Sequence, residues 1–137
     1  MYDVPALEKR IDETLNLVGL QRRRRDLVRN FSRGMQQRLA IARATLHEPR
    51  LLLFDEPHTG LDPEAAVMLD ELLREVAKRG RTIVMTSHDL NRAADLATRV
   101  DILSEGKIAV SIEKGEVDPQ RLSEIYRSVA HGNTENA

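Results

Sequence analysis

The chain contains Leu51-Leu52-Leu53-Phe54-Asp55-Glu56-Pro57, four apolar residues followed directly by two carboxylates and a proline. A short apolar run of this kind is typical of a strand buried on both faces, as in a parallel sheet covered by helices. Open parallel sheets bind their ligands just outside the carboxyl ends of their strands. We therefore expect Asp55 and Glu56 to lie where such a sheet carries out its chemistry.

A second apolar run, residues 82–86, ends in the same way, on Ser87-His88-Asp89. Between the two runs, Asp62-Pro63 predicts a helix start, with an N-cap followed by proline at the first helical position. The helix should bury four residues at helical spacing and end at Gly80; the four are Leu69, Leu72, Leu73 and Val76. The order strand, helix, strand predicts that both strands deliver their carboxyl ends, and so Asp55, Glu56 and His88, to one edge.

The rest of the chain adds helices before this unit and a hairpin after it. Before this unit we expect an amphipathic helix over residues 5–18 and a short helix with a basic face over 22–28. A third helix should run from the N-cap Ser32 to about Leu46 and bury Leu39, Ala42 and Leu46. Two more helices are expected near 89–97 and 119–129. Residues 100–103 and 107–112 flank Ser104-Glu105-Gly106, which predicts a hairpin. The predicted class is α/β with an appended helical part.

Composition excludes several classes of protein. The 137 residues suit one domain with a modest core, and the net charge of -1 implies no general attraction to nucleic acid or membranes. There is no cysteine, which excludes disulfides and thiolate metal sites. No apolar run approaches the length of a membrane span, about 20 residues, and residues 1–10 lack the core of a signal peptide. We expect a soluble intracellular chain that does not bind nucleic acid.

Four motifs occur in an order and spacing that resemble the second half of the nucleotide-binding domain of ABC-type ATPases. Phe31-Ser32-Arg33-Gly34-Met35-Gln36-Gln37-Arg38 is similar to the signature motif, residues 51–56 to the Walker B strand with its glutamate, Gly60-Leu61-Asp62 to the D-loop, and Thr86-Ser87-His88-Asp89 to the switch-histidine loop. The resemblance covers about residues 1–112 and is strongest to exporter-type subunits, including those of haem export.

The resemblance implies a fold and its subdivision. It implies part of a P-loop NTPase-like domain, with parallel strands and helices, part of the helical subdomain and a C-terminal hairpin. Residues 1–130 would form the C-terminal portion of the domain. Within it, residues 1–46 would hold the helical subdomain and signature helix, and residues 47–130 the core with Walker B, D-loop and switch histidine. Residues 131–137 would form a polar tail.

The resemblance also assigns roles in binding and hydrolysing ATP. Asp55 matches the Mg²⁺ ligand, Glu56 the general base for the attacking water, and His88 a donor to the γ-phosphate. These roles agree with the preference of Mg²⁺ for carboxylate and phosphate oxygens and with the use of carboxylates as bases. The alternatives are that Asp55 caps a strand end and that His88 is structural. His47, His58 and His131 show no metal-ligand spacing and are assigned no role.

The signature residues would bind the γ-phosphate of ATP held by a partner subunit. Ser32 and the N–H of Gly34 open a helix, where exposed N–H groups favour an anion. Two residues depart from the Leu-Ser-Gly-Gly-Gln pattern: Arg33, which would suit phosphate or point into solvent, and Met35, which removes a polar contact. Asp62 would cap a helix or contact the other subunit of a dimer. The arginines of residues 22–25 form either a solvated face or a contact with phosphate or an acidic partner.

No Gly-x-x-x-x-Gly-Lys-Ser/Thr loop occurs in the sequence. We therefore expect a fragment that begins near the middle of the parent domain and is inactive alone. The expected partners are a transmembrane transporter subunit and a second ATPase subunit, at the inner face of the cell membrane. Two other functions remain open: a non-enzymatic half-domain that supplies a signature motif in trans, and the signature lobe of a DNA-maintenance ATPase.

Overall fold

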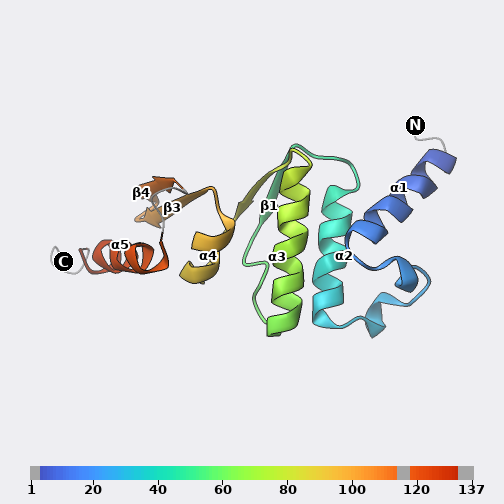
Figure 1. Ribbon diagram of the computed structural model, residues 1–137, viewed down its shortest axis with the longest axis horizontal. Coiled ribbons are helices and arrows are strands. Elements are labelled where there is room, and N and C mark those ends of the chain that lie inside the picture. Colours follow the sequence, from blue (N-terminus) through green and yellow to red (C-terminus); the bar gives the residue numbers. More distant parts are fainter. Residues whose placement is uncertain (1–3, 114–117, 133–137) are drawn as a thin grey trace. The chain divides into compact units, whose positions relative to one another are not determined.

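The computed structural model describes residues 4–113 and 118–132, which divide into two compact units at Thr86/Ser87. The first unit contains α1 (Val4–Leu17), the 3₁₀ turns η1 (Gln21–Arg23) and η2 (Val28–Asn30), α2 (Arg33–Thr45), β1 (Leu51–Phe54), α3 (Pro63–Lys78) and β2 (Thr82–Met85) (Figure 1). The second unit contains α4 (Leu90–Leu96), β3 (Arg99–Ser104), β4 (Lys107–Glu113) and α5 (Pro119–Gly132). The predicted mixed α/β class is confirmed, whereas the predicted subdivision at residues 46/47 stays a prediction.

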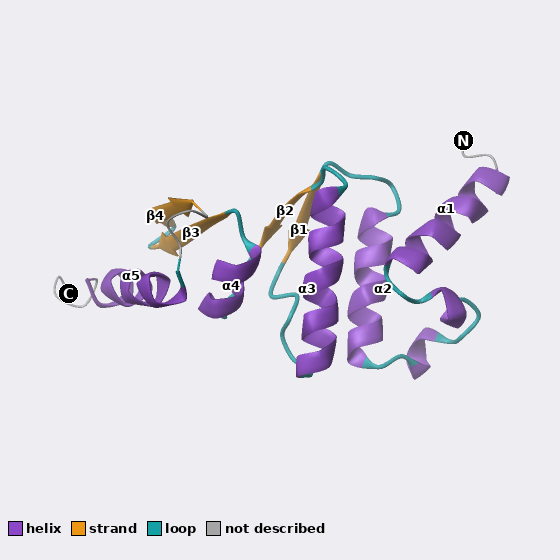
Figure 2. Cartoon of the chain, viewed as in Figure 1, coloured by secondary structure: helices purple, strands orange, loops and turns teal. Residues whose placement is uncertain are grey.

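Strands β1 and β2 pair in parallel, as predicted, and α3 connects them. Their register runs from Leu51 opposite Thr82 to Phe54 opposite Met85. Figure 2 shows both strands alongside α3. Because the two strands end at the same level, the residues that follow them meet at one edge of the sheet.

The core of the first unit lies between one face of this sheet and the helices. It buries Val18, Leu20, Ile41, Ala42, Leu52, Leu69, Leu72, Leu73 and Val76. On the opposite face Leu51, Leu53 and Val84 remain 51%, 70% and 52% exposed. The prediction that residues 51–54 are buried on both faces is therefore wrong, because in the described part of the chain the helices pack on one face only. Burial then alternates with the period of two that a strand imposes.

The helix predictions hold except for residues 22–28. That segment forms parts of two 3₁₀ turns instead of a short α-helix. All residues from 21 to 30 are exposed, so no packing stabilises a helix of that length. In α2 the buried residues are Ile41 and Ala42, whereas Leu39 and Leu46 are only half-buried.

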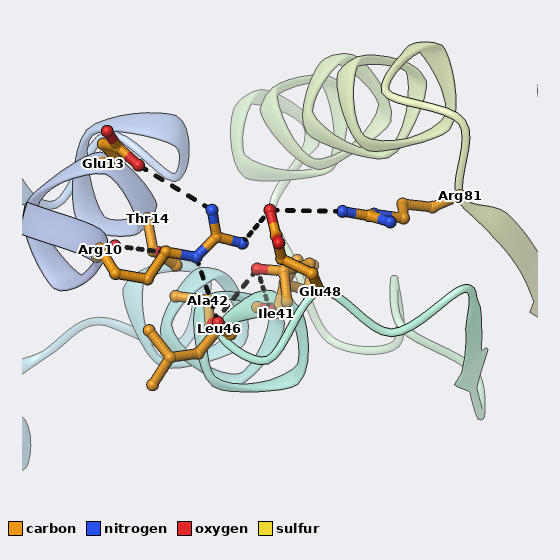
Figure 3. A network of polar contacts seen from close by, with 9 residues as sticks. Arg10, Glu13, Thr14, Ile41, Ala42, Leu46, Glu48 and Arg81 are labelled. Carbon is orange, nitrogen blue, oxygen red and sulfur yellow. Dashed lines mark hydrogen bonds and ion pairs between the residues drawn. The ribbon is translucent and has the colours of Figure 1, made fainter. Parts of the chain in front are cut away.

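A network of polar contacts ties α1 to the loop before β1 and to the start of β2 (Figure 3). Arg10 donates from Nε to the carbonyl of Leu46 at 3.2 Å, and its Nη2 lies 2.7 Å from Glu48 Oε1. The same Glu48 oxygen lies 3.5 Å from Arg81 Nη2, next to the first residue of β2. Glu48 therefore links two arginines that are far apart in the sequence, with its own backbone at a φ of 52°.

The second unit is the predicted hairpin packed with helices. β3 and β4 are antiparallel, and Ser104 pairs with Lys107 across Glu105 and Gly106, whose φ angles are 50° and 75°. Two consecutive positive φ angles are the requirement of a type I′ hairpin turn. Ile102, Ile112 and Leu122 form the core of this unit. α5 extends beyond the predicted end at residue 129 to Gly132, and residues 133–137 of the predicted tail lie outside the described residues.

Candidate functional site

The carboxyl ends of β1 and β2 bring Asp55 and Thr86 together. The hydroxyl of Thr86 donates to Asp55 Oδ1 at 2.5 Å and accepts the backbone N–H of Glu56 at 2.9 Å. The N–H of Thr86 in turn donates to the carbonyl of Phe54 at 3.0 Å, which continues the ladder between the strands. One hydroxyl therefore fixes both the carboxylate of Asp55 and the backbone of Glu56.

The backbone turns sharply at Glu56, whose φ is 45°. This left-handed conformation is uncommon for a residue with a side chain. The carboxylate is half-buried, and Thr59 donates from Oγ1 to Glu56 Oε2 at 3.4 Å. Asp55 is exposed, so the two adjacent carboxylates differ in their access to solvent.

The oxygen atoms at this edge suit a hard cation. Asp55 offers a carboxylate and Thr86 a hydroxyl oxygen beside it. Mg²⁺ takes one or two carboxylates and completes its shell with waters and phosphate oxygens. Within the described residues no group of three or more His, Cys, Asp or Glu side chains could hold a metal ion. The donor set therefore fits Mg²⁺ bound together with a phosphate, and does not form a closed metal site.

Asp62 caps α3, which was one of its two predicted roles. Its Oδ1 accepts the N–H of Ala65 at 2.8 Å, and Pro63 occupies the first turn of the helix. The other predicted role, a contact with a second subunit, stays a prediction. His58, between Glu56 and Asp62, forms a hydrogen bond to Asp70 on α3.

The residues of the signature motif lie at the start of α2. Ser32 is the N-cap, and its Oγ accepts the N–H of Met35 at 3.2 Å. The guanidinium of Arg33 lies over Gly60, where a Cβ would come within 2.3 Å of Arg33 Cζ. Gly34 closely approaches α3, since a Cβ there would lie 2.9 Å from Ala65 Cβ.

His88 lies in the second unit, so its predicted meeting with Asp55 and Glu56 stays a prediction. It is exposed and comes directly before Asp89, the N-cap of α4. The N–H of Arg92 donates to Asp89 Oδ1 at 3.0 Å, and this bond lowers the pKa of Asp89 below its ordinary value of 3.8 against the opposing effect of burial. The segment after β2 therefore begins a helix with an ionised cap.

Thr86 and His58 are the residues of this region to which the sequence analysis gave no role of their own. Thr86 stands directly after β2, as Asp55 does after β1, so the parallel register alone could have paired them. His58 has no comparable pattern, because its partner Asp70 lies on α3 on the face opposite to the exposed side chains of that helix.

Among the described residues, none of the helices combines the length and the apolar character that a membrane-spanning helix needs.

Comparisons with known proteins give consistent results. A family model described as ABC transporter matches residues 3–59. The chain is 48% identical to the bacitracin transport ATP-binding protein BcrA of Bacillus licheniformis over 103 residues. This match covers 74% of this chain and 34% of that protein. It is 37% identical over 125 residues to the methionine import ATP-binding protein MetN of Protochlamydia amoebophila, covering 90% of this chain and 36% of that protein. The chain thus spans about a third of the length of these relatives.

Two solved structures share the fold. One is the ADP conformation of MJ1267, an ATP-binding cassette of an ABC transporter, with a TM-score of 0.79 and 17% identity over 91% of this chain and 48% of that chain. The other is cbiO1 from Clostridium perfringens, part of the ABC transporter complex cbiONQ, with a TM-score of 0.79 and 24% identity over 96% of this chain and 51% of that chain. At these identities the likeness concerns the fold alone.

Proposed function

Because the chain belongs to the ABC transporter ATP-binding family, we propose that it supplies part of the machinery with which a transporter binds and hydrolyses ATP. The observation that carries this proposal is the hydroxyl of Thr86, which joins Asp55 to the backbone of Glu56 at the edge of the parallel sheet. This is the edge at which open parallel sheets bind ligands. The arrangement supports separate roles for the two carboxylates.

Asp55 is the proposed Mg²⁺ ligand and Glu56 the proposed general base. When bound, the metal ion neutralises charge that develops on the phosphate oxygens. Glu56 would accept a proton from the water that attacks the γ-phosphate. His88 would donate a hydrogen bond to the γ-phosphate. Catalysis of this reaction depends mainly on positioning and electrostatic stabilisation, so the hydrogen bonds that hold the carboxylate of Asp55 and the backbone of Glu56 support these roles.

The signature residues are proposed to act on nucleotide bound by a second ATPase subunit. Ser32 is exposed at the start of α2, and Arg33, Gly34 and Met35 form the first helical turn. The N–H groups of such a turn favour a phosphate. Asp62 would contact the second subunit while it caps α3. This role in trans is also what a non-enzymatic half-domain would retain, because the sequence contains no phosphate-binding loop.

The proposed setting is a membrane transporter. cbiO1, which shares the fold, is part of the transporter complex cbiONQ. By analogy we propose that this chain acts with a transmembrane subunit, at the inner face of the cell membrane. The resemblance to haem exporters stays a prediction.

A chimera tests the proposal directly. The segment of BcrA that matches this chain, 34% of that protein, is replaced by the corresponding residues of the chain, and hydrolysis of Mg-ATP is compared with unaltered BcrA. We expect the chimera to hydrolyse ATP and Glu56→Gln to abolish turnover while bound ATP is retained, because the amide cannot accept the proton. Glu71→Gln, the same change at an exposed position of α3, is the matched control. An active chimera that is insensitive to Glu56→Gln would contradict the proposal, and the 137-residue chain alone should show no turnover.

A further inference from the structure

A histidine outside the recognised motifs makes a buried hydrogen bond beside the candidate site. His58 follows Glu56 by two residues, and its Nε2 lies 2.8 Å from Asp70 Oδ1 on α3. The two side chains are only 11% and 10% exposed. A polar pair of this kind is retained in a small core only when its hydrogen bonds are well formed.

The surroundings of the ring select its tautomer. His58 Nδ1 is buried and has no hydrogen-bond partner among the described residues. In the neutral imidazole one nitrogen carries the proton and the other is an acceptor. A proton on Nδ1 would leave a buried donor unpaired and would turn the lone pair of Nε2 toward the oxygen of Asp70. In the neutral ring the surroundings therefore favour the proton on Nε2, from which it would donate to Asp70.

The ring belongs to a turn that contains two backbone hydrogen bonds of its own. The N–H of Thr59 donates to the carbonyl of Glu56, and the N–H of Leu61 to the carbonyl of His58, each at 3.1 Å. Glu56 and Gly60 have φ angles of 45° and 74°. A left-handed residue with a side chain is strained and persists only when its surroundings hold it.

We propose that His58 is a positioning residue for Glu56. Its Nε2–H bond to Asp70 fixes the middle of the turn of residues 56–61 on α3, while the hydroxyl of Thr86 fixes the start of the turn at the N–H of Glu56. Held at both points, the carboxylate of Glu56 keeps one orientation. The functional part of this inference rests on the role of general base proposed above for Glu56.

The first test is a spectroscopic signature of the 137-residue chain without nucleotide. Long-range ¹H–¹⁵N spectra of the histidine rings should show His58 in the Nε2–H form, with a bare Nδ1. A ring in the Nδ1–H form, or one that averages between the two tautomers as an exposed histidine does, would overturn the proposal. This measurement needs no variant and is independent of folding changes.

The second test compares two variants of His58. The amide nitrogen of glutamine in His58→Gln can replace Nε2–H, whereas His58→Phe keeps a ring and removes the donor. We expect hydrogen exchange at the amides of Thr59 and Leu61 to become about tenfold faster in His58→Phe, as for the loss of a hydrogen bond to a charged group, and to return to within about twofold in His58→Gln. His47→Phe, at an exposed histidine, is the control. Equal exchange in all three variants would contradict the proposal.

The third test measures whether substitution of His58 in the chimera changes kcat or KM for ATP hydrolysis. His58→Phe should lower kcat about tenfold, as for the same lost bond, and leave the KM for Mg-ATP unchanged. His58→Gln should recover most of kcat. An unchanged kcat in His58→Phe would overturn the positioning role. A chimera that is inactive with His58 in place would instead contradict the proposed function, while the tautomer and exchange results still decide whether the His58–Asp70 bond holds the turn.

Discussion

Replacing Thr86 with valine removes the hydroxyl that joins Asp55 to Glu56 and keeps the β-branched shape of the side chain. Two hydrogen bonds are lost, one to a carboxylate oxygen at 2.5 Å and one from the N–H of Glu56 at 2.9 Å. A hydrogen bond contributes about 0.5–1.5 kcal/mol, and more when one partner is charged. Because Thr86 and Asp55 are exposed, water replaces part of this, so we expect Thr86→Val to lower the free energy of unfolding of the first unit by about 1–2 kcal/mol.

The assay is a urea titration of the 137-residue chain followed by backbone amide signals of β1 and α3, which report on the first unit alone. Thr86→Ser keeps the hydroxyl and should stay within about 0.5 kcal/mol of the parent, as is usual for an exposed substitution. In the chimera Thr86→Val should also raise the Mg²⁺ concentration needed for turnover, because the carboxylate of Asp55 loses its fixed orientation. If valine and serine lowered stability equally, or neither changed it, the hydroxyl would not be the link that we describe.

Three further predictions concern single residues. Asp55→Asn in the chimera should raise the Mg²⁺ concentration needed for half-maximal turnover and for ATP binding. Glu56→Gln, which abolishes turnover, should leave the Mg²⁺ concentration needed for ATP binding unchanged. Equal shifts of the two variants in a Mg²⁺ titration of ATP binding would show the roles to be misassigned. Ser32→Arg should abolish the Mg-ATP-dependent association of the chain with an intact ATPase subunit in sedimentation. It should lower the free energy of unfolding by only about 1 kcal/mol, because of the lost cap. Association that is the same with and without Mg-ATP, and in the variant, would refute the role in trans. Asp89→Asn should leave the stability of the second unit nearly unchanged at neutral pH, since both residues cap helices. The folded pKa of Asp89 is lowered below 3.8, so its stabilisation is present above the unfolded pKa and is lost as the pH falls through the folded one; an acid unfolding curve should lose this contribution in the variant.

The order of elements and the parallel sheet could be predicted because their local patterns agree with the fold. Asp62 before Pro63 marks the start of α3, and Glu105-Gly106 supplies the two positive φ angles of the hairpin turn. At both places the residue type has a conformational preference that does not depend on distant contacts. The apolar run at 51–54 did not share this property. Its composition is the same for a strand covered on one face or on two, and only the packing shows that Leu53 is exposed.

The site could be predicted in part, for a related reason. Asp55 and Glu56 could be predicted because they follow an apolar run at the strand end where open parallel sheets bind ligands, and the sheet register then places Thr86 beside Asp55. The bond of His58 could not be predicted, because it depends on the rotation of α3 that turns Asp70 toward the turn. Sequence spacing fixes which residues share a face of a helix, but not which side chain of a distant turn that face meets.

The close approach of Gly34 to Ala65 has a mechanical consequence. Where two helices meet through a hydrogen atom and a methyl group, there is no long side chain whose rotation could absorb a small displacement. Ser32 and Asp62 are the residues that cap these two helices. We therefore expect a displacement of the first turn of α2 to reach the first turn of α3, so that Ser32 and Asp62 would shift together.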